Sequence, residues 1–202
     1  MNERFVALKN RWAEIFDLGM SAGVLRWDQT TYMPPGGAPA RGRQLALLAR
    51  LAHERLTDPE VGRLIDALER EIPAGDTEES AFVRLARREF DRAVKVPADF
   101  VSEMQSHFSA SYQLWTEARP ANDFKRVIPA LEKTLELSRR YSDFFPGYAS
   151  IADPHIDYSD PGMKAASVRA IFSELRAQLV PLVKAISDKP LADDSCLKQR
   201  AP

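Results

Sequence analysis

Two prolines followed at once by two glycines, Pro34-Pro35-Gly36-Gly37, interrupt the chain near its start. Proline lacks a backbone N–H, fixes φ and disfavours helical backbone angles in the residue before it, whereas glycine adopts conformations that other residues avoid. No helix can therefore continue from Met33 to Gly37. We expect the chain to reverse at this point, so that a long N-terminal helix is followed by a second one.

Polar and aromatic side chains surround this break: Trp27, Asp28, Gln29, Tyr32 and Arg41. They offer more hydrogen-bonding groups than a plain helix end requires. We expect Trp27 and Tyr32 to be buried and to anchor the turn, because aromatic anchors and polar caps are common at helix ends. We expect Asp28 to pair with Arg26 or Arg41. A catalytic site built from Asp28, Tyr32 and Arg41 is the weaker alternative, since polar side chains at a turn usually cap helices.

Apolar residues recur at three- and four-residue intervals along most of the chain, which is the pattern of helices with one buried face. The first run predicts a helix from about Glu3 to about Thr30, roughly 40 Å long at 1.5 Å per residue. Within it, the spacing of Gly19 and Gly23 would let another helix approach closely. Six more helices are predicted at about residues 39–56, 59–71, 78–94, 97–118, 123–145 and from 161 past 186.

Caps and breaks separate these predicted helices. Asp58 stands where an N-cap residue is expected, either Asp76 or Thr77 is predicted to cap the fourth helix, and Asp160 is predicted to cap the last helix. The segment from Pro146 to Asp160 is predicted to be extended and irregular. We expect a stripe of large side chains in the fifth helix to lie in the core: Phe100, Met104, Phe108, Tyr112 and Trp115. Since no segment alternates with a period of two, we predict an all-α fold of about seven helices in an antiparallel array.

The composition excludes several classes of protein. With 202 residues, 45% of them hydrophobic and 28% charged, the chain is predicted to be one soluble domain over residues 1–202. The 28 basic and 29 acidic residues give a net charge of −1, which argues against nucleic-acid or membrane-surface partners. No stretch approaches the length of a membrane span, and no signal peptide is recognisable. We therefore expect a cytoplasmic protein.

Several segments together carry a family resemblance: Trp27-Asp28-Gln29-x-Thr31-Tyr32-Met33-Pro34-Pro35-Gly36-Gly37-Ala38, Leu56-Thr57-Asp58-Pro59-Glu60-Val61-Gly62, Lys95-Val96-Pro97, Trp115-x-x-Ala118-Arg119-x-x-Asn122-Asp123-Phe124 and Asp157-Tyr158-x-Asp160-Pro161-Gly162-Met163. In this order and at this spacing they resemble the N-terminal region of the thermostable carboxypeptidase Taq family of zinc metallocarboxypeptidases. The resemblance extends to about Asp194. It implies the N-terminal half of a zincin-like helical fold, the wall and lid of a substrate groove, and homodimers in the full-length family.

The zinc site of such an enzyme requires two histidines one helical turn apart, a glutamate between them and a third ligand downstream. The three histidines, His53, His107 and His155, are never four residues apart. His53-Glu54 begins like the motif, but Thr57 stands at the position of the second ligand. We therefore predict no catalytic residue, no metal ligand and no cofactor in this chain, although the full-length family binds zinc.

Two weaker ion sites are conceivable. Glu103 and His107 lie at i and i+4 and could face one metal ion, but two ligands do not make a site. Asp153, His155 and Asp157 alternate along the predicted irregular segment and could ligate an ion, although we expect His155 to be satisfied by water or backbone. The lone Cys196 has no neighbouring histidine and is not expected to act as a nucleophile.

Two functions from different classes follow. In the first, the chain is a truncated relative of a metallocarboxypeptidase, which releases C-terminal residues from peptides, and lacks the catalytic half and hydrolytic activity; contact with a peptide is expected but cannot be assigned to residues. In the second, it is a helical interaction protein. Apolar faces left uncovered would then favour a homo-oligomer, most simply a dimer, or a partner such as a separately encoded catalytic half.

Overall fold

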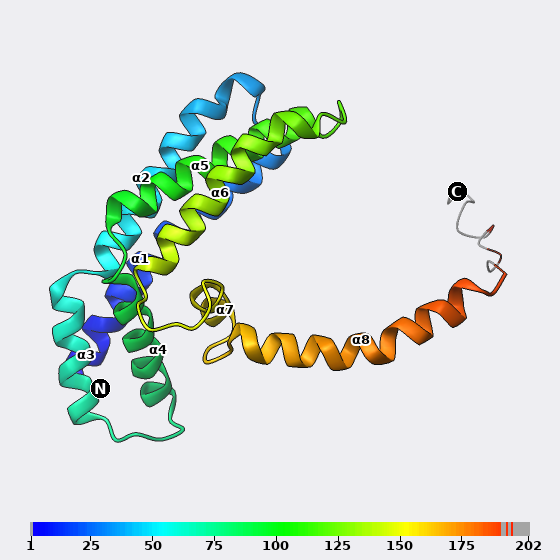
Figure 1. The fold of residues 1–202 in the computed structure, drawn as a ribbon. Coiled ribbons are helices and arrows are strands. Elements are labelled where there is room, and N and C mark those ends of the chain that lie inside the picture. The colour runs from blue at the N-terminus through cyan, green and yellow to red at the C-terminus, as the bar shows by residue number, and fades with distance from the viewer. Residues whose placement is uncertain (1, 191–192, 194, 196–202) are drawn as a thin grey trace. The chain divides into compact units, whose positions relative to one another are not determined.

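The structure is a computed structural model that describes residues 2–190, 193 and 195. Over these residues the chain folds into helices and turns, with no strand. In chain order the elements are α1 (Glu3–Thr31), the 3-10 turn η1 (Pro35–Gly37), α2 (Ala38–Leu56), α3 (Pro59–Glu71), α4 (Glu78–Ala93), α5 (Ala98–Ala118), α6 (Phe124–Asp143), α7 (Asp153–Ser159) and α8 (Ala165–Ser187) (Figure 1). The predicted all-α fold is confirmed.

Contacts along the backbone divide the chain into two compact units, Met1–Phe145 and Pro146–Pro202, which we call the N-terminal and C-terminal units. In the N-terminal unit α2 packs on both α1 and α5, α5 packs on α6, and α3 packs on α1 and α4. The C-terminal unit contains α7 and α8. The interpretation of residues 1–202 as a single domain stays a prediction.

The reversal after α1 takes place at the predicted break. The backbone N–H groups of Tyr32 and Met33 both donate to the carbonyl of Asp28, at 3.0 and 2.9 Å, and so close the last turn of α1. Gly37 N donates to the carbonyl of Pro34 over 2.8 Å within η1. α2 then begins at Ala38 and runs beside α1 (Figure 1).

Local capping explains why several helix boundaries were predictable. The Asp58 carboxylate accepts from Glu60 N at 2.8 Å, and Pro59 occupies the first position of α3, where its missing N–H costs nothing. The Thr77 hydroxyl accepts from Ser80 N at 3.2 Å at the start of α4. In each case a side-chain oxygen satisfies a backbone donor that the helix leaves unpaired.

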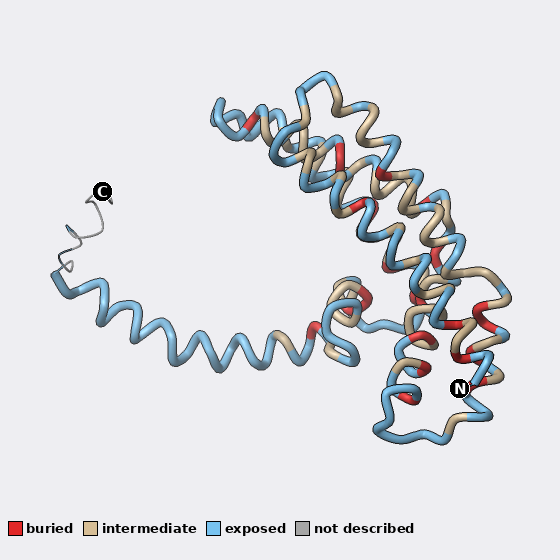
Figure 2. The backbone as a smooth tube through the Cα atoms, turned by 180° about the vertical axis from the view of Figure 1, so that it is seen from behind, coloured by how far each residue is buried: buried red, intermediate tan, exposed pale blue. Residues whose placement is uncertain are grey.

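The core of the N-terminal unit consists of two clusters, and the buried positions are seen along its helices in Figure 2. The first joins α1, α3 and α4 through Phe5, Leu8, Val61, Ile65, Leu68, Val83 and Ala86. The second joins α5 to the end of α6 through Val96, Phe100, Leu137 and Phe145. The expected stripe on α5 is only partly core, since Phe100 is buried but Phe108 and Trp115 are 41% and 48% exposed.

The prediction of an extended segment between Pro146 and Asp160 is wrong, because Asp153–Ser159 forms the helix α7. The last helix also begins later than expected, at Ala165 and without a cap from Asp160. Asp160 instead closes a turn, in which its carbonyl accepts from Met163 N at 2.9 Å and Gly162 adopts a positive φ of 82°. A positive φ interrupts a right-handed helix, so α7 and α8 are separate helices.

α8 confirms the predicted helical periodicity, but nearly all of its residues are exposed (Figure 2). Its apolar side chains therefore do not form a core with α7. None of the described helices is both long and apolar enough to cross a membrane.

Candidate functional site

The residues around the α1–α2 break form a polar tie between the two helices. Arg41 Nη2 donates to Asp28 Oδ2 over 2.6 Å, so one of the two predicted pairings of Asp28 is confirmed. Arg41 also donates through Nη1 to the carbonyl of Leu25 and through Nε to Gln44 Oε1, the latter at 3.2 Å. Only 11% of the Arg41 side chain is exposed. Each of the three guanidinium nitrogens of Arg41 therefore has a hydrogen-bond partner within the N-terminal unit.

The prediction that Trp27 and Tyr32 are buried is wrong for the described chain, in which they are 57% and 76% exposed. The two rings contact each other edge to face, with centroids 5.4 Å apart. The physical reason is the helical position of Trp27, which lies on the outer side of α1 with Phe16, Met20 and Val24, also exposed, whereas Ala22 is buried on the inner side. Trp27 thus extends an apolar stripe on the outside of α1.

Gln29, one of the predicted residues of this group, lines a hollow. It donates through Nε2 to Ser109 Oγ of α5 at 3.4 Å, and Arg26 Nη2 donates to Gln105 Oε1 at 3.2 Å beside it. The hollow holds about 210 Å³ and is completed by Thr30, Leu45, Phe108 and Tyr112. No carboxylate, histidine or cysteine lines it, so the hydroxyls of Thr30, Ser109 and Tyr112 lie there without an adjacent general base to activate them.

Glu103 and His107 are engaged within the α5–α6 pair. Both carboxylate oxygens of Glu103 accept from Arg140, at 2.8 Å each, and Lys133 Nζ lies 3.3 Å from Glu103 Oε1. The Arg140 hydrogen bonds lower the pKa of the Glu103 carboxyl. His107 Nε2 hydrogen-bonds with Thr134 Oγ1 at 2.8 Å. The two side chains therefore hold α5 against α6, which explains their spacing without a metal ion.

Asp153, His155 and Asp157 lie on α7, where they serve different purposes. The buried carboxylate of Asp153 accepts from Ala165 N at 2.8 Å and from Ser150 N at 3.1 Å, and these backbone donors lower its pKa. Asp157 Oδ1 accepts from Gly162 N at 2.8 Å. His155 lines a hollow of about 550 Å³ with the apolar residues Ile156, Met163, Ile171 and Phe172.

The residues that the structure describes do not fit a zinc site. Within residues 2–190, 193 and 195, no three side chains of histidine, cysteine, aspartate or glutamate are grouped so that they could hold a metal ion. The possible ion site on α7 gains no support, because backbone N–H groups already occupy both oxygens of Asp153. Cys196 lies outside the described residues.

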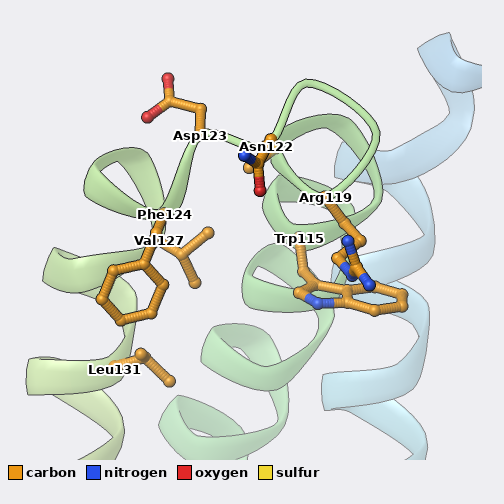
Figure 3. Close-up of a pocket in the computed structure, with 8 residues that line it drawn as sticks. Trp115, Arg119, Asn122, Asp123, Phe124, Val127 and Leu131 are labelled. Carbon is orange, nitrogen blue, oxygen red and sulfur yellow. The ribbon is translucent and has the colours of Figure 1, made fainter.

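A hollow between the end of α5 and the start of α6 was not anticipated from the sequence. It holds about 400 Å³, and Figure 3 shows Trp115 and Arg119 on its α5 side and Phe124, Val127 and Leu131 on its α6 side. Asn122, in the turn, has a positive φ of 52°. Phe124 directly follows the capping residue Asp123, and its exposure, which marks the hollow, is seen only in the structure. Asp123 also lines the hollow, and its carboxylate caps α6 by accepting from Arg126 N at 3.2 Å. The hollow thus offers apolar contacts, one guanidinium group and one carboxylate, which is not the acid–base pair of a hydrolase.

Comparisons with known proteins give one consistent answer. The family model described as "Carboxypeptidase Taq (M32) metallopeptidase" matches residues 7–202. The chain is 30% identical over 192 residues to Thermostable carboxypeptidase 1 of Thermus thermophilus, covering 89% of this chain and 38% of that protein. It is 25% identical over 181 residues to Carboxypeptidase 1 of Bacillus subtilis, covering 86% of this chain and 36% of that protein.

Solved structures agree with the sequence matches. The crystal structure of M32 carboxypeptidase from Deinococcus radiodurans R1 is 43% identical, with a TM-score of 0.73, and the match covers 95% of this chain and 39% of that one. A structure titled "BsuCP Crystal Structure", at 22% identity, shares the fold with a TM-score of 0.87. The chain thus spans well under half the length of the relatives it matches.

Proposed function

Since the chain belongs to the carboxypeptidase Taq (M32) metallopeptidase family, we propose that residues 1–202 are the non-catalytic N-terminal part of a metallocarboxypeptidase and do not hydrolyse peptides on their own. A metallocarboxypeptidase releases C-terminal residues from peptides with a metal-activated water. In this proposal the helices of the chain contribute the wall and lid of the substrate groove. The metal and the general base belong to the part of the relatives that this chain does not match.

The observation that carries this proposal is the distribution of the metal-binding side chains. The three histidines lie on three different helices, His53 on α2, His107 on α5 and His155 on α7. Where a zinc helix needs its second histidine, Thr57 ends α2 and donates its hydroxyl to the carbonyl of His53 at 2.9 Å. A catalytic zinc site uses three protein ligands together with an open position, which this arrangement does not provide.

The test is elemental analysis for zinc on untagged protein, combined with a peptide-release assay. A short peptide is incubated with the chain, with and without added zinc or cobalt, and released C-terminal amino acids are quantified by mass spectrometry. The Deinococcus radiodurans enzyme, assayed in parallel, controls for the substrate and the buffer. We expect substoichiometric metal and no release. Stoichiometric metal together with turnover would disprove the proposal.

A second function is favoured by the exposed apolar side chains of α1 and α8. Large uncovered apolar surfaces on a soluble chain are typical of interaction sites. We propose that the chain also acts as a helical interaction protein, which either self-associates or binds a partner such as a separate catalytic half. Sedimentation velocity at several protein concentrations tests this role: a monomer at every concentration, without binding to any helical partner probe, would count against it.

A further inference from the structure

Helix α8 begins without a cap from its own N-terminus. Its N-cap residue is Lys164, which makes no side-chain hydrogen bond to the first turn. Four other helices begin with a side-chain cap, from Asn2, Asp58, Thr77 and Asp123. A lysine side chain carries donors and no acceptor, whereas the first backbone N–H groups of a helix all need acceptors. The acceptor at the start of α8 must therefore come from outside the helix.

Asp153, the first residue of α7, provides this acceptor. Its Oδ1 accepts from Ala165 N at 2.8 Å, and Ala165 is the first residue of α8. A hydrogen bond to an ionised carboxylate is about twice as strong as one between neutral groups. The negative charge also interacts favourably with the positive end of the α8 helix dipole. Asp153 thus caps a helix that begins twelve residues after it.

Two carboxylates of α7 hold the backbone on both sides of that helix. Asp153 Oδ2 accepts from Ser150 N at 3.1 Å, in the chain that leads into α7. One turn further along α7, Asp157 Oδ1 accepts from Gly162 N at 2.8 Å. Gly162 lies in the turn between α7 and α8 and has a positive φ of 82°, which glycine adopts readily. The carboxylates therefore tie together the approach to α7, the turn after it and the start of α8.

These bonds restrain the direction of α8 as well as its start. The two oxygens of Asp153 belong to one planar group, so the backbone at Ser150 and at Ala165 is held in one arrangement around it. Asp157 restrains the turn, whereas Asp153 binds α8 itself. With 23 residues, α8 is roughly 35 Å long, and a rotation of about 20° at its start would move its end by about 12 Å. A small change at Asp153 is therefore amplified along α8.

We propose that Asp153 is a positioning residue with two separable roles: its carboxylate completes the first turn of α8, and it fixes the angle at which α8 leaves α7. Loss of the carboxylate then unwinds the first turn and also lets α8 rotate about the segment from Asp160 to Lys164. All the residues involved belong to the C-terminal unit, so this joint is the same however the two units are arranged. It also acts independently of any peptidase or interaction role of the chain.

The test is double electron–electron resonance between spin labels on α7 and α8 of the full chain. The labels are attached at Ser159→Cys and Gln178→Cys in a Cys196→Ser background, so that no other thiol reacts. Protein that retains Asp153 should give one narrow distribution of distances. In Asp153→Ala the distribution should become at least about twice as wide, because α8 is no longer held at one angle. Asp160→Ala is the matched control and should leave the distribution unchanged, since the turn uses the backbone carbonyl of Asp160.

A rescue variant separates the two roles of Asp153. Asp153→Ala should move the Cα chemical shifts of residues 165–168 toward coil values. Aspartate is a preferred N-cap residue, so adding Lys164→Asp should restore the helical shifts but leave the distance distribution wide. Asp153→Asn keeps the side-chain shape and one acceptor oxygen, so it should give an intermediate width even where alanine unfolds the C-terminal unit. A narrow distribution in both Asp153 variants, unchanged shifts in Asp153→Ala, or recovery of the narrow distribution by Lys164→Asp would overturn the proposal.

Discussion

Arg41 Nη2 lies 2.6 Å from Asp28 Oδ2, and this ion pair joins α2 to α1 one turn before the chain reverses. The guanidinium also binds the carbonyl of Leu25, so it contacts α1 at two places. A carboxylate, an arginine and a tyrosine close together in the sequence suggested catalytic chemistry as one alternative. In the structure the pair links the two helices, since Arg41 and Asp28 hydrogen-bond to each other and Arg41 also binds the backbone of α1.

Arg41→Ala should lower the free energy of unfolding by roughly 1–2 kcal/mol, because it removes a largely buried side chain and its hydrogen bonds to a charged group, while the freed Asp28 is exposed enough to be rehydrated. Urea denaturation followed by circular dichroism measures the change. Arg63→Ala is the matched control: Arg63 pairs with Glu60 at 2.9 Å on the surface of α3, and its loss should cost less than about 0.5 kcal/mol. Equal effects of the two substitutions would contradict the role assigned to Arg41.

Substitution of glycine by alanine should change the stability in opposite directions at two helical positions, Gly62 and Gly23. A Cβ added at Gly62 in α3 would lie 2.7 Å from Phe90 Cζ, so Gly62→Ala must displace a core ring. The overpacking cost of about 1–3 kcal/mol should exceed the helix-propensity gain of about 1 kcal/mol. At Gly23 in α1 nothing lies within 4 Å of such a Cβ, and Gly23→Ala should stabilise by up to about 1 kcal/mol. Thermal or urea unfolding gives both signs, and stabilisation by Gly62→Ala would show that α3 and α4 are less closely packed.

The features that the sequence predicted correctly depend on neighbouring residues. Asp58 and Thr77 cap helices that begin directly after them, and the prolines and glycines of the first break act on their own backbone. The burial of Trp27 was mispredicted because it depends on which side of α1 meets α2, and that is decided by residues far away in the chain. Helix α7 was missed for a similar reason: the carboxylate of Asp153 is satisfied by Ala165 N, twelve residues later.

Site prediction was limited in the same way. The spacing of the histidines was sufficient to show that the zinc motif does not occur, because that motif is local. The partners of His107 on α6 and of Gln29 on α5 could not be read from spacing, since they are brought close only by helix packing. The hollow beside Trp115 could not be predicted either. The apolar stripe of α5 is regular, and it does not show where the helix that packs on it, α6, begins or ends.

His53 should make stability depend on pH near neutrality. Burial lowers the pKa of its imidazole, although a hydrogen bond with the Val96 backbone and the charge of Glu54 oppose this effect. A histidine whose pKa is lower in the folded state contributes stability that is fully present above its unfolded pKa of about 6.5 and is lost as the pH falls through the folded pKa. His53→Gln should reduce the fall in the free energy of unfolding below about pH 6.5. Urea titrations at several pH values would refute this if wild type and variant showed the same slope.

Asp153→Asn should change the acid response of the C-terminal unit. The carboxylate is buried and accepts from Ala165 N and Ser150 N, and these donors favour its charged form and lower its pKa. For a carboxyl with a lowered folded pKa, the stabilisation is present above the unfolded pKa of about 3.9 and disappears as the pH falls through the folded pKa. The asparagine variant keeps one oxygen but loses the charge, so at pH 7 it should be less stable than wild type. The stabilities of the two proteins should converge as acid protonates Asp153.

Nuclear magnetic resonance of the side-chain carboxyl carbon reports the pKa of Asp153 directly, and acid titrations of both proteins report their stability. Asp160→Asn is a suitable control, because the Asp160 side chain is exposed and its turn uses the backbone carbonyl. A stability difference between wild type and Asp153→Asn that persists unchanged below the folded pKa would show that the carboxylate acts through shape and not through its charge.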